Sequence, residues 1–129
     1  MQRRLRRRAT AVVSRDGRVL LVRNRWQRPF SLPGGGIRLG ESVENAAARE
    51  LRVELRLTVE KVTRRPACDW DGSANRHHVC LVEASGEPVR RRIEVAEYRW
   101  WDGKEPLDVF PHVRAIMERV SFPPAEDPG

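Results

Sequence analysis

Two glutamates, Glu50 and Glu54, stand four residues apart in a stretch without glycine or proline. On a helix this spacing places both carboxylates on one side, one turn apart, where they repel each other when both are ionised. A divalent cation bound by both would remove that repulsion. Carboxylate oxygens favour hard ions such as Mg²⁺, Mn²⁺ or Ca²⁺ over zinc. The alternative is a solvated helix face, in which the glutamates pair with Arg49 and Arg52.

A glycine loop, Pro33-Gly34-Gly35-Gly36, precedes this predicted helix. The three glycines carry no side chains that would block the backbone carbonyls and amides, so a metal ion or a phosphate can approach closely. A carboxylate pair next to such a loop is compatible with a metal site that receives a phosphate, and the solvated helix face stays open as the alternative.

The stretch from Gly35 to Leu57 resembles the Nudix box, the signature of the Nudix hydrolase family. That signature is a glycine, five residues, a glutamate, seven residues, and then Arg-Glu-aliphatic-any-Glu-Glu-any-Gly-aliphatic. Leu32-Pro33-Gly34 precedes it here, as in the family. Seven of the nine specified positions match, namely Gly35, Glu41, Arg49, Glu50, Leu51, Glu54 and Leu57. The resemblance covers nearly the whole chain and implies the Nudix fold and hydrolysis of a diphosphate linkage.

The resemblance also implies roles for the box residues. Glu50, Glu54 and the carbonyl of Gly35 would be the inner ligands of Mg²⁺, or of Mn²⁺ in its place. Glu41 and Arg49 would pair across the loop in a bidentate contact, and so would hold the glycine turn against the helix.

Two positions depart from the family's pattern. Val53 stands where the first glutamate of the Glu-Glu pair is expected, so a further metal ligand, or the group that holds a metal-bound water, is lost. This leaves open how many metal ions bind and how fast turnover is. Arg56 replaces the glycine that usually closes the helix. That loss is less serious, because a left-handed cap is only one way to end a helix, and a cation near the C-terminus suits the helix dipole.

A catalytic base in this family often lies outside the box, late in the chain. The segment from Ile93 to Trp101 resembles the family's glutamate-rich stretch before an Arg-Trp strand. Glu94, at the loop edge before the strand, is the predicted base, and Glu97 is expected to make surface or fold-supporting contacts. His77 and His78 open a strand and should point to opposite sides, with packed or surface roles.

Three arginines, Arg23, Arg25 and Arg28, lie just ahead of the glycine loop and are candidate substrate-binding residues for phosphate. Phe30 occupies a position where the family often has a tryptophan that supports the loop, so we expect it in the core. Trp26, Trp70 and Tyr98 could stack on a nucleobase.

The elements around these residues follow from local patterns. Asp16-Gly17 between two β-rich runs predicts a hairpin. Ser42 is expected to cap a helix over Val43–Leu55, whose stripe is Val43, Ala47, Leu51 and Leu55. Asp108 is expected to cap a last helix, whose apolar side is Val109, Val113, Ile116, Met117 and Val120. Further strands are predicted over residues 57–63, 78–84 and 95–101. The fold class is therefore α/β, a Nudix-like α/β/α sandwich with a mixed sheet between helices.

Length and composition set the broad class. The 129 residues suit one domain, expected over residues 1–120, with a flexible tail over 121–129 that contains three prolines. No apolar run is long enough to span a bilayer, so no membrane association is expected. The two cysteines, Cys68 and Cys80, are too few for a disulfide framework and indicate reduced thiols in a cytoplasmic protein.

The formal charge of +7 is the excess of 25 basic residues, nearly all arginines, over 18 acidic residues, and it favours anionic partners. The predicted function is Mg²⁺-dependent hydrolysis of a nucleoside diphosphate linked to another group, by a monomer or a homodimer. The alternative is a Nudix-fold module of low activity that binds RNA or a regulatory nucleotide. Val53 and the run from Arg3 to Arg8 favour the alternative, although charged residues on an edge strand also discourage aggregation.

Overall fold

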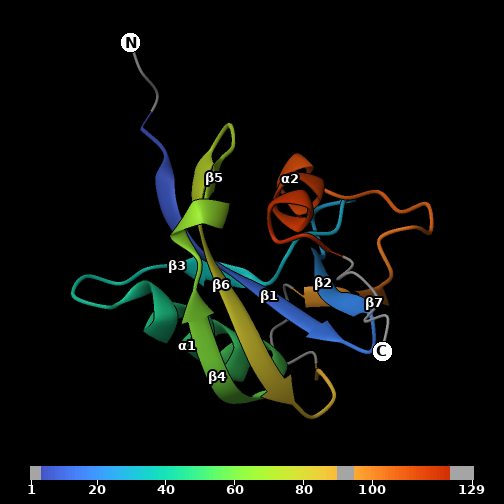
Figure 1. Ribbon diagram of the computed structural model, residues 1–129, viewed down its shortest axis with the longest axis horizontal. Coiled ribbons are helices and arrows are strands. Elements are labelled where there is room, and N and C mark those ends of the chain that lie inside the picture. Colours follow the sequence, from blue (N-terminus) through green and yellow to red (C-terminus); the bar gives the residue numbers. More distant parts are fainter. Residues whose placement is uncertain (1–3, 90–94, 123–129) are drawn as a thin grey trace.

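A computed structural model describes residues 4–89 and 95–122 of the protein. The chain forms one mixed β-sheet with a helix on each side (Figure 1). The elements in chain order are β1 (Arg6–Arg15), β2 (Arg18–Asn24), β3 (Gly34–Gly36), α1 (Val43–Leu55), β4 (Thr58–Arg64), a short 3₁₀ turn (Pro66–Cys68), β5 (Trp70–Asp71), β6 (Asn75–Ser85), β7 (Val95–Trp101) and α2 (Pro111–Arg119). The predicted α/β/α sandwich is confirmed.

Strand β1 is central to the sheet, whose order is β4-β6-β1-β2-β7, with β3 also paired to β1 and β5 to β6. It runs parallel to β6 and antiparallel to β2 and β3. The β1–β2 turn is the predicted hairpin, because Asp16 and Gly17 both have positive φ, at 52° and 75°. In the run from Arg6 to Arg8, all three residues pair with β6, and only Arg8 also pairs with β3.

The two faces of the sheet bury separate cores. Alternate residues of β1 supply them, because neighbouring side chains of a strand point to opposite sides. Ala9, Ala11 and Val13 pack with the buried face of α1. Val12 packs instead with a cluster that includes Val113 and Ile116 of α2. Phe30 is 4% exposed and belongs to this second cluster, as expected.

Helix α1 has the bounds that its sequence predicts. The Ser42 side chain accepts a hydrogen bond from the backbone N–H of Asn45 at 3.1 Å. Ala47, Leu51 and Leu55 are buried against the sheet. The helix ends at Arg56 in the left-handed conformation, with φ 57°. The left-handed cap is thus kept, with an arginine in the place of the family's glycine.

Helix α2 begins later than the sequence prediction. Its N-cap is Phe110, without a side-chain hydrogen bond, and Pro111 is the first helical residue. The Asp108 cap is therefore wrong. The backbone carbonyl of Asp108 accepts from the N–H of Phe30 at 2.8 Å, and Val109 bridges to the same residue. These contacts keep the chain extended up to the proline, whose fixed φ then suits a helix start.

Both cysteines are free and buried. Burial raises the pKa of the Cys80 thiol to about 11, so this side chain behaves as a small apolar group.

No helix within the described ranges is both long and apolar enough to cross a membrane. Phe122 still packs against the α2 core, whereas residues 123–129 of the predicted tail lie outside the described part of the chain.

Candidate active site

The glycine loop lies between β1 and α1. Gly34 and Gly35 pair with Thr10 and Ala9 of β1. A Cβ at Gly34, whose φ is 153°, would lie 2.0 Å from the carbonyl oxygen of Ala9. A Cβ at Gly35 would lie 2.5 Å from the carboxyl carbon of Glu50. Gly34 therefore requires glycine, because its clash is with backbone, whereas a Cβ at Gly35 would displace the Glu50 carboxylate from its place beside the loop.

Arg49 joins the loop to the helix. Its guanidinium donates to both carboxylate oxygens of Glu41, at 2.8 and 2.9 Å, and to the Gly36 carbonyl at 3.0 Å. Nη1 also donates to Glu50 at 2.8 Å. The hydrogen bonds from Arg49 lower the pKa of Glu41 to about 2. The contact that the sequence predicts between Glu41 and Arg49 is thus present, in bidentate form.

Glu50 and Glu54 lie on the side of α1 that faces the loop and Arg8. The Glu50 side chain is 12% exposed, and both carboxylates act electrostatically on the guanidinium of Arg8. Val53, between them in sequence, is 37% exposed to solvent. The position where the family has a third box carboxylate is therefore occupied by an exposed apolar side chain.

The residues present fit a magnesium ion with few protein ligands. Residues 4–89 and 95–122 contain no group of three or more His, Cys, Asp or Glu side chains arranged to hold a metal. Glu50 and Glu54 provide two carboxylates, and Gly35, which lies against the Glu50 carboxylate, provides a backbone carbonyl. Mg²⁺ is commonly held by one or two carboxylates, with water and substrate phosphates as its other ligands. Such an ion would be held by Glu50, Glu54 and the Gly35 carbonyl.

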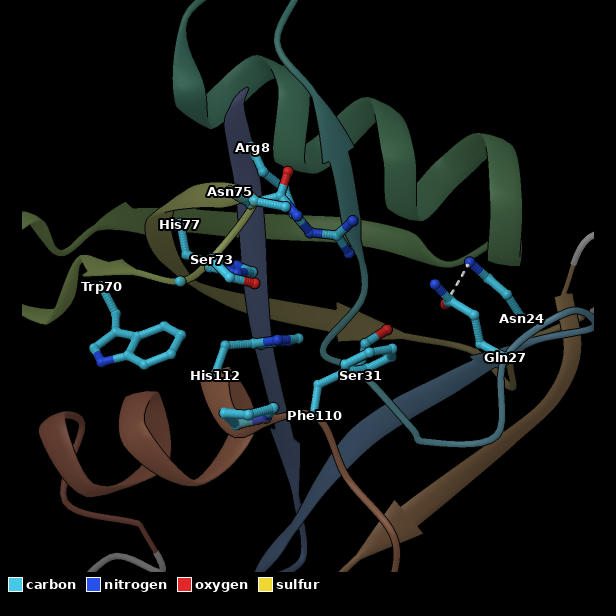
Figure 2. Close-up of a pocket in the computed structure, with 13 residues that line it drawn as sticks. Arg8, Asn24, Gln27, Ser31, Trp70, Ser73, Asn75, His77, Phe110 and His112 are labelled. Carbon is cyan, nitrogen blue, oxygen red and sulfur yellow. Dashed lines mark hydrogen bonds between the residues drawn. The ribbon is translucent and has the colours of Figure 1, made fainter. Parts of the chain in front are cut away.

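A pocket of about 300 Å³ opens on the α2 side of the sheet (Figure 2). Arg8 of β1, Trp70 of β5, His77 of β6, and Phe110 and His112 at the start of α2 line it. Its remaining lining side chains, Asn24, Gln27, Ser31, Ser73 and Asn75 among them, are uncharged. An aromatic pocket with several amide groups can hold a flat polar ring.

Two histidines form the floor of this pocket. The rings of His77 and His112 stack with their centroids 4.2 Å apart. His77 Nδ1 lies 2.8 Å from the Thr10 hydroxyl, and His112 Nε2 accepts from the Leu32 backbone N–H at 3.2 Å. Burial, with the nearby Arg8 charge, lowers the pKa of His77 to about 4. Burial, with the proximity of His77, lowers that of His112 to about 3. Both rings are therefore neutral near pH 7.

The sequence matches the NUDIX domain model over residues 4–120. The chain belongs to the Nudix family. No curated protein matches the sequence. Among solved structures, a nudix hydrolase family member from Chromobacterium violaceum is 30% identical with a TM-score of 0.78, over 94% of this chain and 79% of that chain.

Two further solved structures are similar. A MutT Nudix hydrolase from Burkholderia pseudomallei is 26% identical with a TM-score of 0.75, over 92% of this chain and 99% of that chain. An ADP-ribose pyrophosphatase from Streptococcus suis is 18% identical with a TM-score of 0.72, over 89% and 91% of the two chains, and shares the fold. The protein is thus a Nudix hydrolase, an enzyme that acts on pyrophosphate bonds.

Of the two late glutamates of this Nudix hydrolase, the structure describes Glu97 but not Glu94. Glu94, the predicted base, lies outside the described residues. Glu97 lies in β7, where its carboxylate is 3.1 Å from Arg23 and 3.7 Å from Arg99. These ion pairs are contacts of the fold-supporting kind expected for Glu97. The assignment of the base to Glu94 stays a prediction.

The three arginines ahead of the loop do not line the pocket. Arg23 contacts Glu97 and donates to the Gln27 carbonyl at 3.2 Å, whereas Arg25 and Arg28 are exposed. Their role as phosphate contacts stays a prediction. The arginine that does line the pocket is Arg8, which sequence reasoning placed only in a basic run. Its alternation with Thr10 and Val12 on one face of β1 was the available signal.

Proposed function

We propose that the protein is a Mg²⁺-dependent hydrolase of a nucleoside diphosphate linked to another moiety. The observation that carries the proposal is the packing of the Glu50 carboxylate against Gly35, where a Cβ would fit only if that carboxylate moved. The backbone of the loop and a helix carboxylate therefore lie side by side, and the glycines leave the loop open to a phosphate. Glu54, one turn further along α1, adds a second carboxylate.

A bound Mg²⁺ would neutralise charge on the diphosphate and make the attacking water more acidic. The other roles in the reaction belong to residues of the chain. Glu50 and Glu54 hold the ion, and Arg49 holds the loop against α1. Glu94, or a box glutamate in its place, accepts a proton from the water. The water oxygen attacks one phosphorus in line, and the other phosphate leaves with the electrons of the broken P–O bond.

The pocket supports a nucleotide as the substrate. Trp70 and Phe110 offer ring faces for a base, and Asn75, Asn24 and Gln27 offer amide donors and acceptors. The pocket also adjoins the glycine loop, because Leu32 bonds to both Arg8 and His112. A base in the pocket would therefore place its phosphates toward Glu50 and Glu54.

A second function has one specific observation in its favour. Val53 is exposed where the family has a carboxylate, which suits a module that binds RNA or a regulatory nucleotide with little turnover. Release of phosphate or nucleoside monophosphate from a nucleotide panel, with Mg²⁺ and with Mn²⁺, separates the two functions. Salt-sensitive RNA binding without turnover would favour the binding module.

The same panel tests the metal ligands. We expect Glu50→Gln and Glu54→Gln each to lower kcat by at least about 10²-fold while the fold survives, because each removes a ligand of the cation. Glu44→Gln is the matched control, since it removes a carboxylate from the first turn of the same helix. A glutamine variant that keeps more than about a third of the rate at saturating Mg²⁺ would show that its residue is not an inner ligand.

We further propose a cytoplasmic location. The two free cysteines support it, because neither Cys68 nor Cys80 is paired and both are packed in the core. Unpaired buried thiols are usual where the surroundings are reducing.

A further inference from the structure

Arg8 is a largely buried cation with unused hydrogen-bonding capacity. Its Nη2 donates to the Leu32 carbonyl at 2.9 Å. Its Nε is shielded from solvent and has no hydrogen-bond partner, the one such buried side-chain atom in residues 4–89 and 95–122. A guanidinium has five N–H donors. Arg49, by comparison, donates to Glu41, Glu50 and Gly36 at once. Arg8 is thus not held by the protein in the way that a structural arginine is.

The charges around Arg8 come from the predicted metal ligands. Glu54 and Glu50 are the carboxylates that act on it, while burial disfavours its charged form. Figure 2 shows the guanidinium on the α1 side of the pocket, opposite Trp70. A cation bound by Glu50 and Glu54 would reduce the negative charge available to Arg8. A second anion is then needed to keep this buried guanidinium compensated.

Arg8 is also the one charged side chain among the described residues that line the pocket, since both histidines are neutral near pH 7. Arg8 and His112 both bond to the backbone of Leu32, because His112 accepts from the N–H of Leu32 while Arg8 donates to its carbonyl. Leu32 leads directly into the glycine loop. Arg8 therefore lies where the pocket ends and the site of Glu50 and Glu54 begins.

We propose that Arg8 binds the oxygens of the substrate's diphosphate at this boundary, with the pocket holding the group attached to it. The inference rests on the proposed function. A diphosphate supplies what Arg8 lacks, namely a hydrogen-bond acceptor for a guanidinium whose Nε has none, and a negative charge that remains when a cation occupies Glu50 and Glu54. Guanidinium groups suit phosphate because two parallel N–H donors match two oxygens. Arg8 is thereby a substrate-binding residue that positions the diphosphate.

The test is calorimetric titration of inorganic pyrophosphate in Mg²⁺, because pyrophosphate has no base that Arg8 could contact. We expect Arg8→Gln to weaken pyrophosphate binding by about tenfold or more, and Arg8→Lys by several-fold, since lysine keeps the charge but loses the paired donors. Arg6→Gln is the matched control. It removes the same charge from the same face of β1, at an exposed position outside the pocket. We expect it to change the affinity by less than about twofold.

Titration of Mg²⁺ alone provides the second readout. If Arg8 binds substrate, Arg8→Gln should leave Mg²⁺ affinity unchanged or tighten it, because a competing cation beside the carboxylates is gone. Weaker pyrophosphate binding with undiminished Mg²⁺ binding is a split that loss of the fold cannot produce. If Arg8→Gln weakens the binding of both pyrophosphate and Mg²⁺, the site itself is damaged. The pyrophosphate affinity of Arg8→Lys then decides whether Arg8 binds the substrate.

Two outcomes overturn the proposal. Pyrophosphate affinity in Arg8→Gln equal to that in Arg6→Gln, or wild-type affinity in Arg8→Lys where Arg8→Gln is damaged, would show that Arg8 only balances the charge of Glu50 and Glu54. Failure of the unaltered enzyme to bind pyrophosphate in Mg²⁺, together with no turnover of any nucleotide, would overturn the proposed function as well. The two failures are therefore distinguishable.

Discussion

Every box carboxylate of the described structure has an arginine near it. Glu41 and Glu50 accept hydrogen bonds from Arg49, and Glu50 and Glu54 both act on Arg8. A divalent cation must compete with these guanidinium groups for the same oxygens. The number of carboxylates should therefore govern metal affinity strongly in this protein.

Val53 is the residue at which that number can be raised. We expect Val53→Glu to tighten Mg²⁺ binding or raise turnover, because it restores the family's missing carboxylate to the helix that carries Glu50 and Glu54. A Mg²⁺ titration of the rate measures this, and Val53→Gln, of similar size without charge, is the control. Since Val53 is 37% exposed, stability should change by no more than about 0.5 kcal/mol. If Val53→Glu has the same Mg²⁺ dependence of the rate as the wild type, the site has reorganised around the valine.

Single substitutions also test which of the late glutamates, Glu94 or Glu97, is the general base. We expect Glu94→Gln to lower kcat by about 10²-fold or more with little change in KM, the usual effect of removing a general base. It should also flatten the acidic limb of log kcat against pH. Glu97→Gln should cost less than about tenfold, because Glu97 is engaged by Arg23.

The reverse ranking of the two variants would assign the base to Glu97. Two mild variants would move the base to Glu50, Glu54 or a histidine such as His78.

Among the elements, α1 carries both the predicted ligands and a strained end. Arg56 closes it with φ 57°, and its N–H donates to the carbonyls of Arg52 and Leu51. The left-handed conformation costs a residue with a Cβ about 1–2 kcal/mol. The helix nevertheless ends there, because Leu57 must turn back into the α1 core, where it is 2% exposed.

We therefore expect Arg56→Gly to raise the free energy of unfolding by about 0.5–1 kcal/mol, after the greater freedom of glycine in the unfolded chain is subtracted. Urea unfolding followed by circular dichroism measures it. Arg56→Ala is the control and should not stabilise, because alanine meets the same strain. A glycine variant less stable than the wild type would mean that the Arg56 side chain itself supports the helix end.

For the whole molecule, the buried histidine pair links stability to pH. The pKa of His77 falls to about 4 and that of His112 to about 3 in the folded protein, against an ordinary value of 6.5. The unfolded chain therefore binds more protons than the folded chain below about pH 6.5. As the pH falls from about 6.5 toward these folded pKa values, the free energy of unfolding decreases. Above pH 6.5 both states carry neutral rings and the contribution is constant.

We accordingly expect the urea midpoint to fall between pH 7.5 and pH 5.0. In His112→Gln, whose side-chain oxygen can still accept from Leu32, the fall should be smaller. The measurement uses equal ionic strength at each pH, so that screening of the arginine-rich surface does not change. An equal fall in both proteins would show that other groups dominate the pH dependence.

The features that depend on neighbours along the chain could be predicted from the sequence. The Asp16-Gly17 hairpin, the Ser42 cap, the bounds of α1 and the spacing of Glu41, Glu50 and Glu54 all follow from local rules of turn, cap and period. The contact of Arg49 with Glu41, eight residues away, was also predictable, because a known motif encodes it. Asp108 shows the limit of such rules, because its backbone bond to Phe30 and the bridge between Val109 and Phe30 keep the chain extended where a cap was predicted.

The contacts between residues far apart in the sequence could not be predicted and depend on the tertiary structure. Arg8 reaches Leu32 over 24 positions, Thr10 reaches His77 over 67, and Leu32 reaches His112 over 80. Alternation along β1 indicates which side chains share a face, but it does not state which strand or helix that face meets. That depends on the parallel pairing of β1 with β6 and on the docking of α2, both of which are long-range contacts. The pocket, and with it Arg8, therefore exists only in the folded chain.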